Sequence, residues 1–211
     1  GVPFSDPVAD GPIIMKAGRK AIDEGSNINF IFDELIKNKN TISSKYVLMT
    51  YYNILSAYGE KLFLDKCDEA GVYGLIIPDL PCELTKKFKK EFYHHSVKII
   101  SLIAMTASDA RIMQIAKNSE GFIYTVTMNA TTGNSGEFHP DLKRKIEYIK
   151  KVSKIPVVAG FGIKNPEHVK DIASVADGIV IGSEIVKRIE IDSRKEFITY
   201  IKSIRTALNS F

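Results

Sequence analysis

The alternation of short apolar runs with amphipathic stretches is the feature that most constrains the fold of this 211-residue chain. Runs rich in β-branched or apolar residues, as expected of strands, cover 46–51, 73–77, 97–104, 122–127, 155–159 and 178–181. Amphipathic helical stretches lie between them, for example 59–70, 83–95, 108–118, 142–153 and 165–175. Because connections of this length join parallel strands, the pattern predicts an α/β protein whose parallel sheet is covered by helices.

The predicted helices have ordinary boundary signals, such as Gly71 after one helix and Asn165-Pro166 before another. Residues 1–211 contain no linker and no shift in composition, so we expect a single domain. Periodicity alone leaves open both a doubly wound sheet and a (β/α)8 barrel. Six predicted strands follow the opening loop. If the fold is an eight-stranded barrel, strand 1, helix 1 and most of strand 2 lie outside these residues.

Composition narrows the classes of function. The net charge is +4 with dispersed lysines, and the densest cluster, residues 86–90, reads as the solvated face of a helix, so no nucleic-acid partner is expected. No apolar run approaches the ~20 residues that a membrane helix needs. Cys67 and Cys82 are expected to be reduced thiols, and the histidines show no metal-ligand spacing. We expect a cytoplasmic protein without a metal, although residues 1–211 leave organellar targeting open.

The first twelve residues form a stiff loop that carries two acids. Pro3, Pro7 and Pro12 exclude a regular helix or a central strand, and Asp6 and Asp10 lie between them. Charged side chains on a stiff loop suit catalysis better than packing.

Glycine turns follow the last two predicted strands. Gly160-Phe161-Gly162 comes after 155–159, and Gly182-Ser183 comes after 178–181 and opens a helical stretch over 184–190. Two such turns on consecutive strands, the second at a helix N-terminus, are typical of the phosphate site of (β/α)8 barrels. Plain strand-end turns are the alternative interpretation of each.

A third glycine-bearing loop, 131–136, follows the strand 122–127 and is long enough to act as a lid. A simple surface loop is the alternative. Tyr124 lies within that strand, where an aromatic side chain belongs either to the core or to the mouth of a barrel.

These residues resemble one family, the tryptophan synthase alpha chain. The run Gly1–Pro12 (GVPFSDPVADGP) is similar to that family's signature. The similarity continues through Pro78-Asp79-Leu80-Pro81, Thr132-Gly133, Gly160-Phe161-Gly162 and Gly182-Ser183, in the family's order and spacing. The resemblance implies a (β/α)8 barrel and a lyase that cleaves indole-3-glycerol phosphate to indole and glyceraldehyde 3-phosphate without a cofactor.

The resemblance also implies roles for single residues. Asp10 matches the aspartate that hydrogen-bonds the indole nitrogen, and carboxylate stabilisation of a developing cation is sound electrostatics. The expected substrate-binding residues are Tyr124, Thr132, Met49 and Phe161, and the expected phosphate contacts are Gly133, Gly162, Gly182 and Ser183.

Three departures from the family pattern bear on activity. Met15 stands where a glutamine is usual, and Met128–Thr131 replace an Arg-Ser-Gly stretch before the lid threonine. The family's general acid/base is a glutamate two residues before the glycine that matches Gly1, which lies outside the 211 residues. We therefore expect a polypeptide of these residues alone to be inactive.

The resemblance implies an α2β2 heterotetramer with a β chain that carries pyridoxal phosphate and receives the indole. The surface around the opening loop and the lid would face that partner. Two other classes remain open at this point. One is a non-catalytic protein that binds and activates the β chain, and the other is a different phosphate-binding barrel enzyme, such as a sugar-phosphate isomerase.

Overall fold

The computed structural model describes residues 1–126, 141–160 and 162–210. All strand pairs among them are parallel, and they form two sheets with the orders β1-β2-β3 and β4-β5-β6-β7. The chain divides into two compact units, Gly1–Ile100 and Ser101–Phe211. The expectation that residues 1–211 form one domain stays a prediction.

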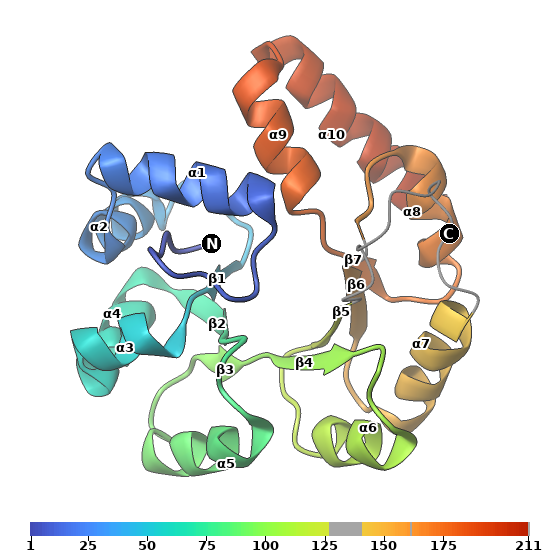
Figure 1. Ribbon diagram of the computed structural model, residues 1–211, viewed down its shortest axis with the longest axis horizontal. Coiled ribbons are helices and arrows are strands. Elements are labelled where there is room, and N and C mark those ends of the chain that lie inside the picture. The colour runs from blue at the N-terminus through green and yellow to red at the C-terminus, as the bar shows by residue number, and fades with distance from the viewer. Residues whose placement is uncertain (127–140, 161, 211) are drawn as a thin grey trace. The chain divides into compact units, whose positions relative to one another are not determined.

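The first unit places helices around a three-stranded sheet (Figure 1). Its elements are α1 (Pro12–Asp23), α2 (Ile28–Asn38), β1 (Tyr46–Met49), α3 (Tyr52–Tyr58), α4 (Glu60–Ala70), β2 (Val72–Ile76), α5 (Cys82–Glu91) and β3 (Lys98–Ile99). Phe32 of α2 meets Phe63 of α4 edge to face, with ring centroids 5.2 Å apart, and Leu75 of β2 is fully buried in the same cluster. This packing fixes the helical layer on β2.

Local signals explain where the helices of this unit begin and end. The Asn27 side chain accepts hydrogen bonds from the backbone N–H groups of Asn29 and Phe30 at the start of α2. Gly71 ends α4 in the left-handed conformation, with φ 71°. The sequence prediction of a helix end at Gly71 is thus confirmed.

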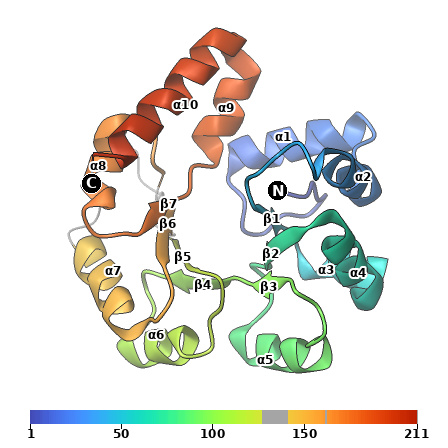
Figure 2. The same cartoon turned by 180° about the vertical axis from the view of Figure 1, so that it is seen from behind.

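The second unit has a four-stranded sheet and longer C-terminal helices (Figures 1 and 2). Its elements are β4 (Ser101–Ala104), α6 (Asp109–Ala116), β5 (Ile123–Val126), α7 (Asp141–Val152), β6 (Val157–Gly160), α8 (Pro166–Ala173), β7 (Gly178–Ile179), α9 (Ser183–Ile191) and α10 (Arg194–Leu208). Helix α10 packs along α8, as both views show. The Asn165 side chain caps α8 ahead of Pro166, as the sequence predicted.

Each predicted strand corresponds to an observed one, but the prediction of a single strand over 97–104 is wrong. Residues of β3 pair with β2, whereas β4 pairs with β5, and the division falls at the buried Ile100. The backbone N–H of Ile100 still donates to the carbonyl of Leu75 at 2.8 Å, so the break lies where the chain changes its partner strand.

The predicted helix over 83–95 is too long, because α5 ends at Glu91. His95 instead turns toward α4, where its Nδ1 lies 2.6 Å from the Asp68 carboxylate, and Ser96 donates to the same carboxylate through its backbone N–H and its hydroxyl. Burial raises the pKa of Asp68, but the hydrogen bonds from Ser96 and His95 outweigh it and lower that pKa. These tertiary contacts with Asp68 therefore end α5 earlier than the local sequence pattern predicts.

Among the described residues, no helix combines the length and the apolar character needed to cross a membrane.

Candidate active site

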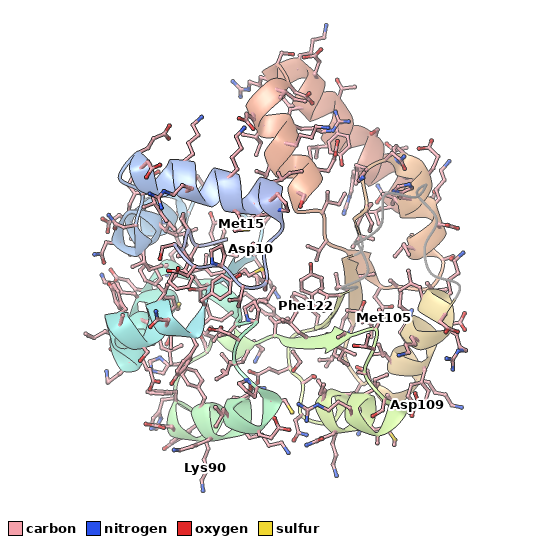
Figure 3. All side chains as sticks on the ribbon, viewed as in Figure 1. Asp10, Met15, Lys90, Met105, Asp109 and Phe122 are labelled. Atoms are coloured by element: carbon pink, nitrogen blue, oxygen red, sulfur yellow. The ribbon has the colours of Figure 1, made fainter. Side chains whose placement is uncertain are left out.

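The opening segment lies beside β1. The backbone N–H of Val2 donates to the Met49 carbonyl at 2.8 Å, and Val2 is buried. The chain then loops to Pro12, where α1 begins, and Asp10 lies half-buried just before that helix (Figure 3). The acidic loop therefore starts beside the end of β1.

Tyr51 fixes the loop from the other side. It follows β1, is only 3% exposed, and its ring lies against Phe4 with centroids 5.2 Å apart. Its hydroxyl accepts a hydrogen bond from the backbone N–H of Ala9 at 3.0 Å. Burial raises the pKa of Tyr51, the Ala9 N–H lowers it, and the neighbouring Asp10 carboxylate raises it again. Tyr51 thus contacts the loop at the residue before Asp10.

Asp79 holds the backbone that follows Tyr51. Its carboxylate oxygens accept from the Tyr52 N–H at 2.9 and 3.1 Å, where α3 begins. Asp79 comes soon after β2, and Met49 is the last residue of β1. In this unit the opening loop, Met49 and Asp79 therefore gather at the carboxyl ends of neighbouring strands, where parallel α/β folds place their sites.

In the second unit, Tyr124 of β5 lies over the end of β6. A Cβ atom built on Gly160 would be 2.4 Å from the Tyr124 hydroxyl oxygen and from Cε2 of its ring. The ring therefore occupies the space that a side chain at position 160 would take. Burial raises the pKa of Tyr124. The neighbouring Thr125 is buried and donates to the Val158 carbonyl at 3.0 Å, which fixes the strand next to this ring.

Both predicted glycine turns lie at one edge of this sheet. Strands β6 and β7 are parallel neighbours, and Gly162 follows β6 while Gly182 follows β7. Gly162 is exposed and has φ 67°, a conformation that favours glycine. Gly182 is the N-cap of α9 and Ser183 its first residue, and both are exposed. No side chain of the described residues caps this helix, so its first N–H groups are available to bind an anion.

An ion-pair cluster stabilises α9 just behind that N-terminus. Arg188 Nε lies 2.8 Å from the Glu184 carboxylate, and its Nη1 lies 3.1 Å from that of Asp192. The guanidinium also lies over the Tyr200 ring of α10, 4.0 Å from its centroid. The negative charge of Glu184 at the helix start is thereby neutralised.

Several predicted site residues lie outside the described part of the chain. These are Thr132, Gly133 and Phe161, together with the lid loop and the Met128–Thr131 departure. Met15 is described and is exposed on the first turn of α1 (Figure 3). Among the described residues, no three histidine, cysteine or acidic side chains group as metal ligands would. The roles given to Asp10, Met49, Tyr124, Gly162, Gly182 and Ser183 stay predictions.

Tyr51 and Asp79 are the residues of this region whose structural role the sequence did not predict. Asp79 belongs to the motif Pro78–Pro81, which contributes to the family resemblance, but no role was expected of it. An aspartate directly after a strand was the signal that could have found it. Tyr51 gave no comparable signal, because its partner Ala9 is 42 residues away in the sequence.

Parallel strands, an anchored acidic loop, and glycine turns ahead of an open helix N-terminus are typical of α/β enzymes of the (β/α)8-barrel class. The sequence profile of the family described as "Tryptophan synthase alpha chain" matches residues 1–209. The chain belongs to this family. A tryptophan synthase alpha chain of Staphylococcus epidermidis is 97% identical over 210 residues, which are 100% of this chain and 86% of the relative.

Solved structures agree with that assignment. The tryptophan synthase subunit alpha of Legionella pneumophila has a TM-score of 0.88 at 29% identity, covering 100% of this chain and 80% of that one. A chain from the tryptophan synthase a2b2 complex of Pyrococcus furiosus has a TM-score of 0.85 at 29% identity, covering 99% and 84%. The likeness confirms the predicted fold class, the (β/α)8 barrel.

Proposed function

We propose that the chain catalyses the alpha reaction of tryptophan synthesis, the retro-aldol cleavage of indole-3-glycerol phosphate to indole and glyceraldehyde 3-phosphate. The observation that carries the proposal is the family match over residues 1–209 together with the anchored loop that presents Asp10. Membership in this family sets aside the alternative of a sugar-phosphate isomerase.

In the proposed reaction, a proton is added to C3 of the indole ring and the nitrogen becomes cationic. The hydroxyl group on the adjacent side-chain carbon loses its proton, a carbonyl forms there, and the C–C bond to the ring breaks. Its electron pair returns to the ring and restores neutral indole. The Asp10 carboxylate accepts the indole N–H and stabilises the transient positive charge. The proton transfers require a general acid/base, which the family resemblance assigns to a glutamate outside residues 1–211.

The second unit supplies groups suited to the phosphate and the ring. The N-terminus of α9 with Gly182 and Ser183, and the turn at Gly162, offer backbone N–H groups and a hydroxyl to the phosphate. Tyr124 offers an aromatic face beside them in the same sheet. Cleavage needs no electron sink beyond the indole ring itself, so we propose that the chain works without a cofactor.

We also propose that the chain pairs with a β chain in an α2β2 complex and passes indole to it. The assembly described for the Pyrococcus furiosus relative supports this. Pyridoxal phosphate is then expected only on the β chain, and a cytoplasmic location fits an enzyme of amino-acid biosynthesis. A polypeptide of residues 1–211 alone is expected to release no indole, because the proposed acid/base is outside it.

The test uses an α chain of the length of its relatives that carries these 211 residues. Indole release from indole-3-glycerol phosphate is measured with and without a tryptophan synthase β chain. We expect turnover that the β chain stimulates, and a loss of about 10²–10³-fold in kcat for Asp10→Asn. Asp23→Asn is the matched control, because Asp23 is exposed at the far end of α1, where it pairs with Arg19. Stimulation of the β chain without any indole release would instead identify a non-catalytic activator.

A further inference from the structure

The surroundings of Tyr51 go beyond what packing requires. The side chain is 3% exposed, its ring is covered by Phe4, and its hydroxyl reaches the backbone of a loop 42 residues earlier in the sequence. A buried tyrosine hydroxyl usually finds a hydrogen-bond partner. Here that partner is the amide of Ala9, immediately before the proposed catalytic carboxylate.

The proton count on the Tyr51 hydroxyl fixes the direction of its hydrogen bonds. A phenol has one proton to donate and lone pairs with which to accept. The Ala9 N–H donates to the oxygen at 3.0 Å, so the phenolic proton remains free for another acceptor. The Asp10 carboxylate is close enough to Tyr51 to raise the pKa of the phenol, and an ionised carboxylate can only accept a hydrogen bond. The neighbouring Asp10 carboxylate is therefore suited to accept the phenolic proton while the phenol oxygen accepts from Ala9.

The tyrosine itself is held rigidly. The residue before it, Thr50, donates its N–H to the Ile76 carbonyl of β2 at 3.0 Å, and the residue after it, Tyr52, donates its N–H to Asp79. Both supports come from the end of β2 or just beyond it. A hydroxyl fixed on two strands can transmit that rigidity to a loop that proline has already stiffened.

We infer that Tyr51 is a positioning residue for the cleavage reaction: its hydroxyl anchors the Ala9 backbone and orients the Asp10 carboxylate toward the indole nitrogen. The inference rests on the proposed role of Asp10. The carboxylate is then oriented before the substrate binds, so it can stabilise the developing positive charge without reorganisation.

The test compares Tyr51→Phe with Tyr58→Phe in an α chain of the length of its relatives, assayed with the β chain. Both changes remove one hydroxyl from the first unit and keep the ring. The Tyr58 hydroxyl donates to Asn29 of α2 at 2.9 Å, outside the opening loop. We expect Tyr51→Phe to lower kcat about 10- to 100-fold, the size of one hydrogen bond to a charged group, and to change KM less than about threefold. Tyr58→Phe should change neither.

A second background separates positioning from general structural damage. In a chain that already carries Asp10→Asn, Tyr51→Phe should cost less than about threefold in kcat, because the two changes act on one interaction. Equal losses in both backgrounds, or equal behaviour of Tyr51→Phe and Tyr58→Phe, would overturn the inference. Absence of turnover in the unsubstituted chain would instead overturn the proposed function.

Amide exchange tests the anchor without relying on activity. In the chain without substrate, Tyr51→Phe should speed hydrogen exchange at Ala9 at least about tenfold, since the amide loses its acceptor. The amide of Val2, which is bonded to Met49, is the internal reference. Unchanged exchange at Ala9 would show that Tyr51 does not hold the loop and would refute the inference.

Discussion

The contact between Tyr124 and Gly160 shows how a missing side chain can shape a site. The tyrosine ring occupies the space that a Cβ at position 160 would fill. The ring can take this position because residue 160 is glycine. The pair joins two neighbouring strands of one sheet, β5 and β6. The position of a residue expected to contact the substrate thus depends on a neighbouring residue that has no side chain.

Gly160→Ala is expected to displace the Tyr124 ring. The added Cβ would come within 2.4 Å of it, and a half-buried aromatic ring has little room to move. We expect the free energy of unfolding to fall by about 1–3 kcal/mol, as for other overpacked positions. We also expect KM for indole-3-glycerol phosphate to rise. Urea unfolding and steady-state kinetics measure the two effects.

Gly18→Ala is the matched control, because a Cβ at Gly18 in α1 meets nothing within 4 Å. It should stabilise the chain by up to about 1 kcal/mol through helix propensity. If Gly160→Ala behaved like Gly18→Ala, the ring would not be held as described.

The sequence predicted the conformation of single residues where that conformation depends on neighbouring residues in the chain. The turn at Gly162 and the helix start at Gly182-Ser183 both follow from short motifs, and the structure gives Gly162 a positive φ and makes Gly182 the N-cap of α9. Contacts between distant segments gave no such signal. The hydrogen bond between Ala9 and Tyr51 depends on the fold, and a tyrosine after an apolar strand reads equally well as core.

At the scale of elements, strand and helix positions were largely predictable, because apolar runs and capping residues mark them. The errors arose where tertiary contacts overrode the local pattern. The run 97–104 is continuous in hydrophobicity, yet it divides between two partner strands. The helical pattern extends to His95, but the contacts of His95 and Ser96 with Asp68 end α5 at Glu91.

The ion-pair cluster of Arg188 with Glu184 and Asp192 on α9 leads to a prediction about substrate affinity. Arg188→Met would leave Glu184 unpaired in the first turn of the helix expected to bind the phosphate. Repulsion between that carboxylate and the phosphate should raise KM roughly 5- to 30-fold, the effect of about 1–2 kcal/mol, with little change in kcat. Steady-state kinetics at low ionic strength measure the effect.

The double variant Glu184→Gln, Arg188→Met is the control for that prediction. It removes the repelling charge, so KM should return toward its original value, although the contact with Tyr200 stays lost. A KM that stayed high in the double variant would show that Arg188 acts by holding α9 against α10 and not by neutralising Glu184.

At the scale of the whole molecule, the comparisons and the sequence agree on one fold class, although the chain covers 86% of its 97%-identical relative. The described strands form one sheet of three and one of four, and a closed barrel of this class needs eight strands. Strands at the edges of open sheets expose unpaired backbone groups.

A polypeptide restricted to residues 1–211 is therefore expected to be marginally stable and prone to aggregate. Its thermal unfolding, followed by circular dichroism, should be broad, and it should bind a hydrophobic dye before heating. A chain of the length of its relatives should unfold in one cooperative transition under the same conditions. A sharp transition from residues 1–211 alone would refute this expectation.

The pairing of Glu184 with Arg188 also has an evolutionary consequence. An acidic residue in the first turn of a helix that is expected to bind an anion carries a penalty unless a base lies one turn later, so Glu184 is not neutral without Arg188. In lineages related to this one, the two positions should therefore be gained and lost together, with Arg188 arising first. The order follows from the charges, because an unpaired arginine near a phosphate does no harm, whereas an unpaired glutamate does.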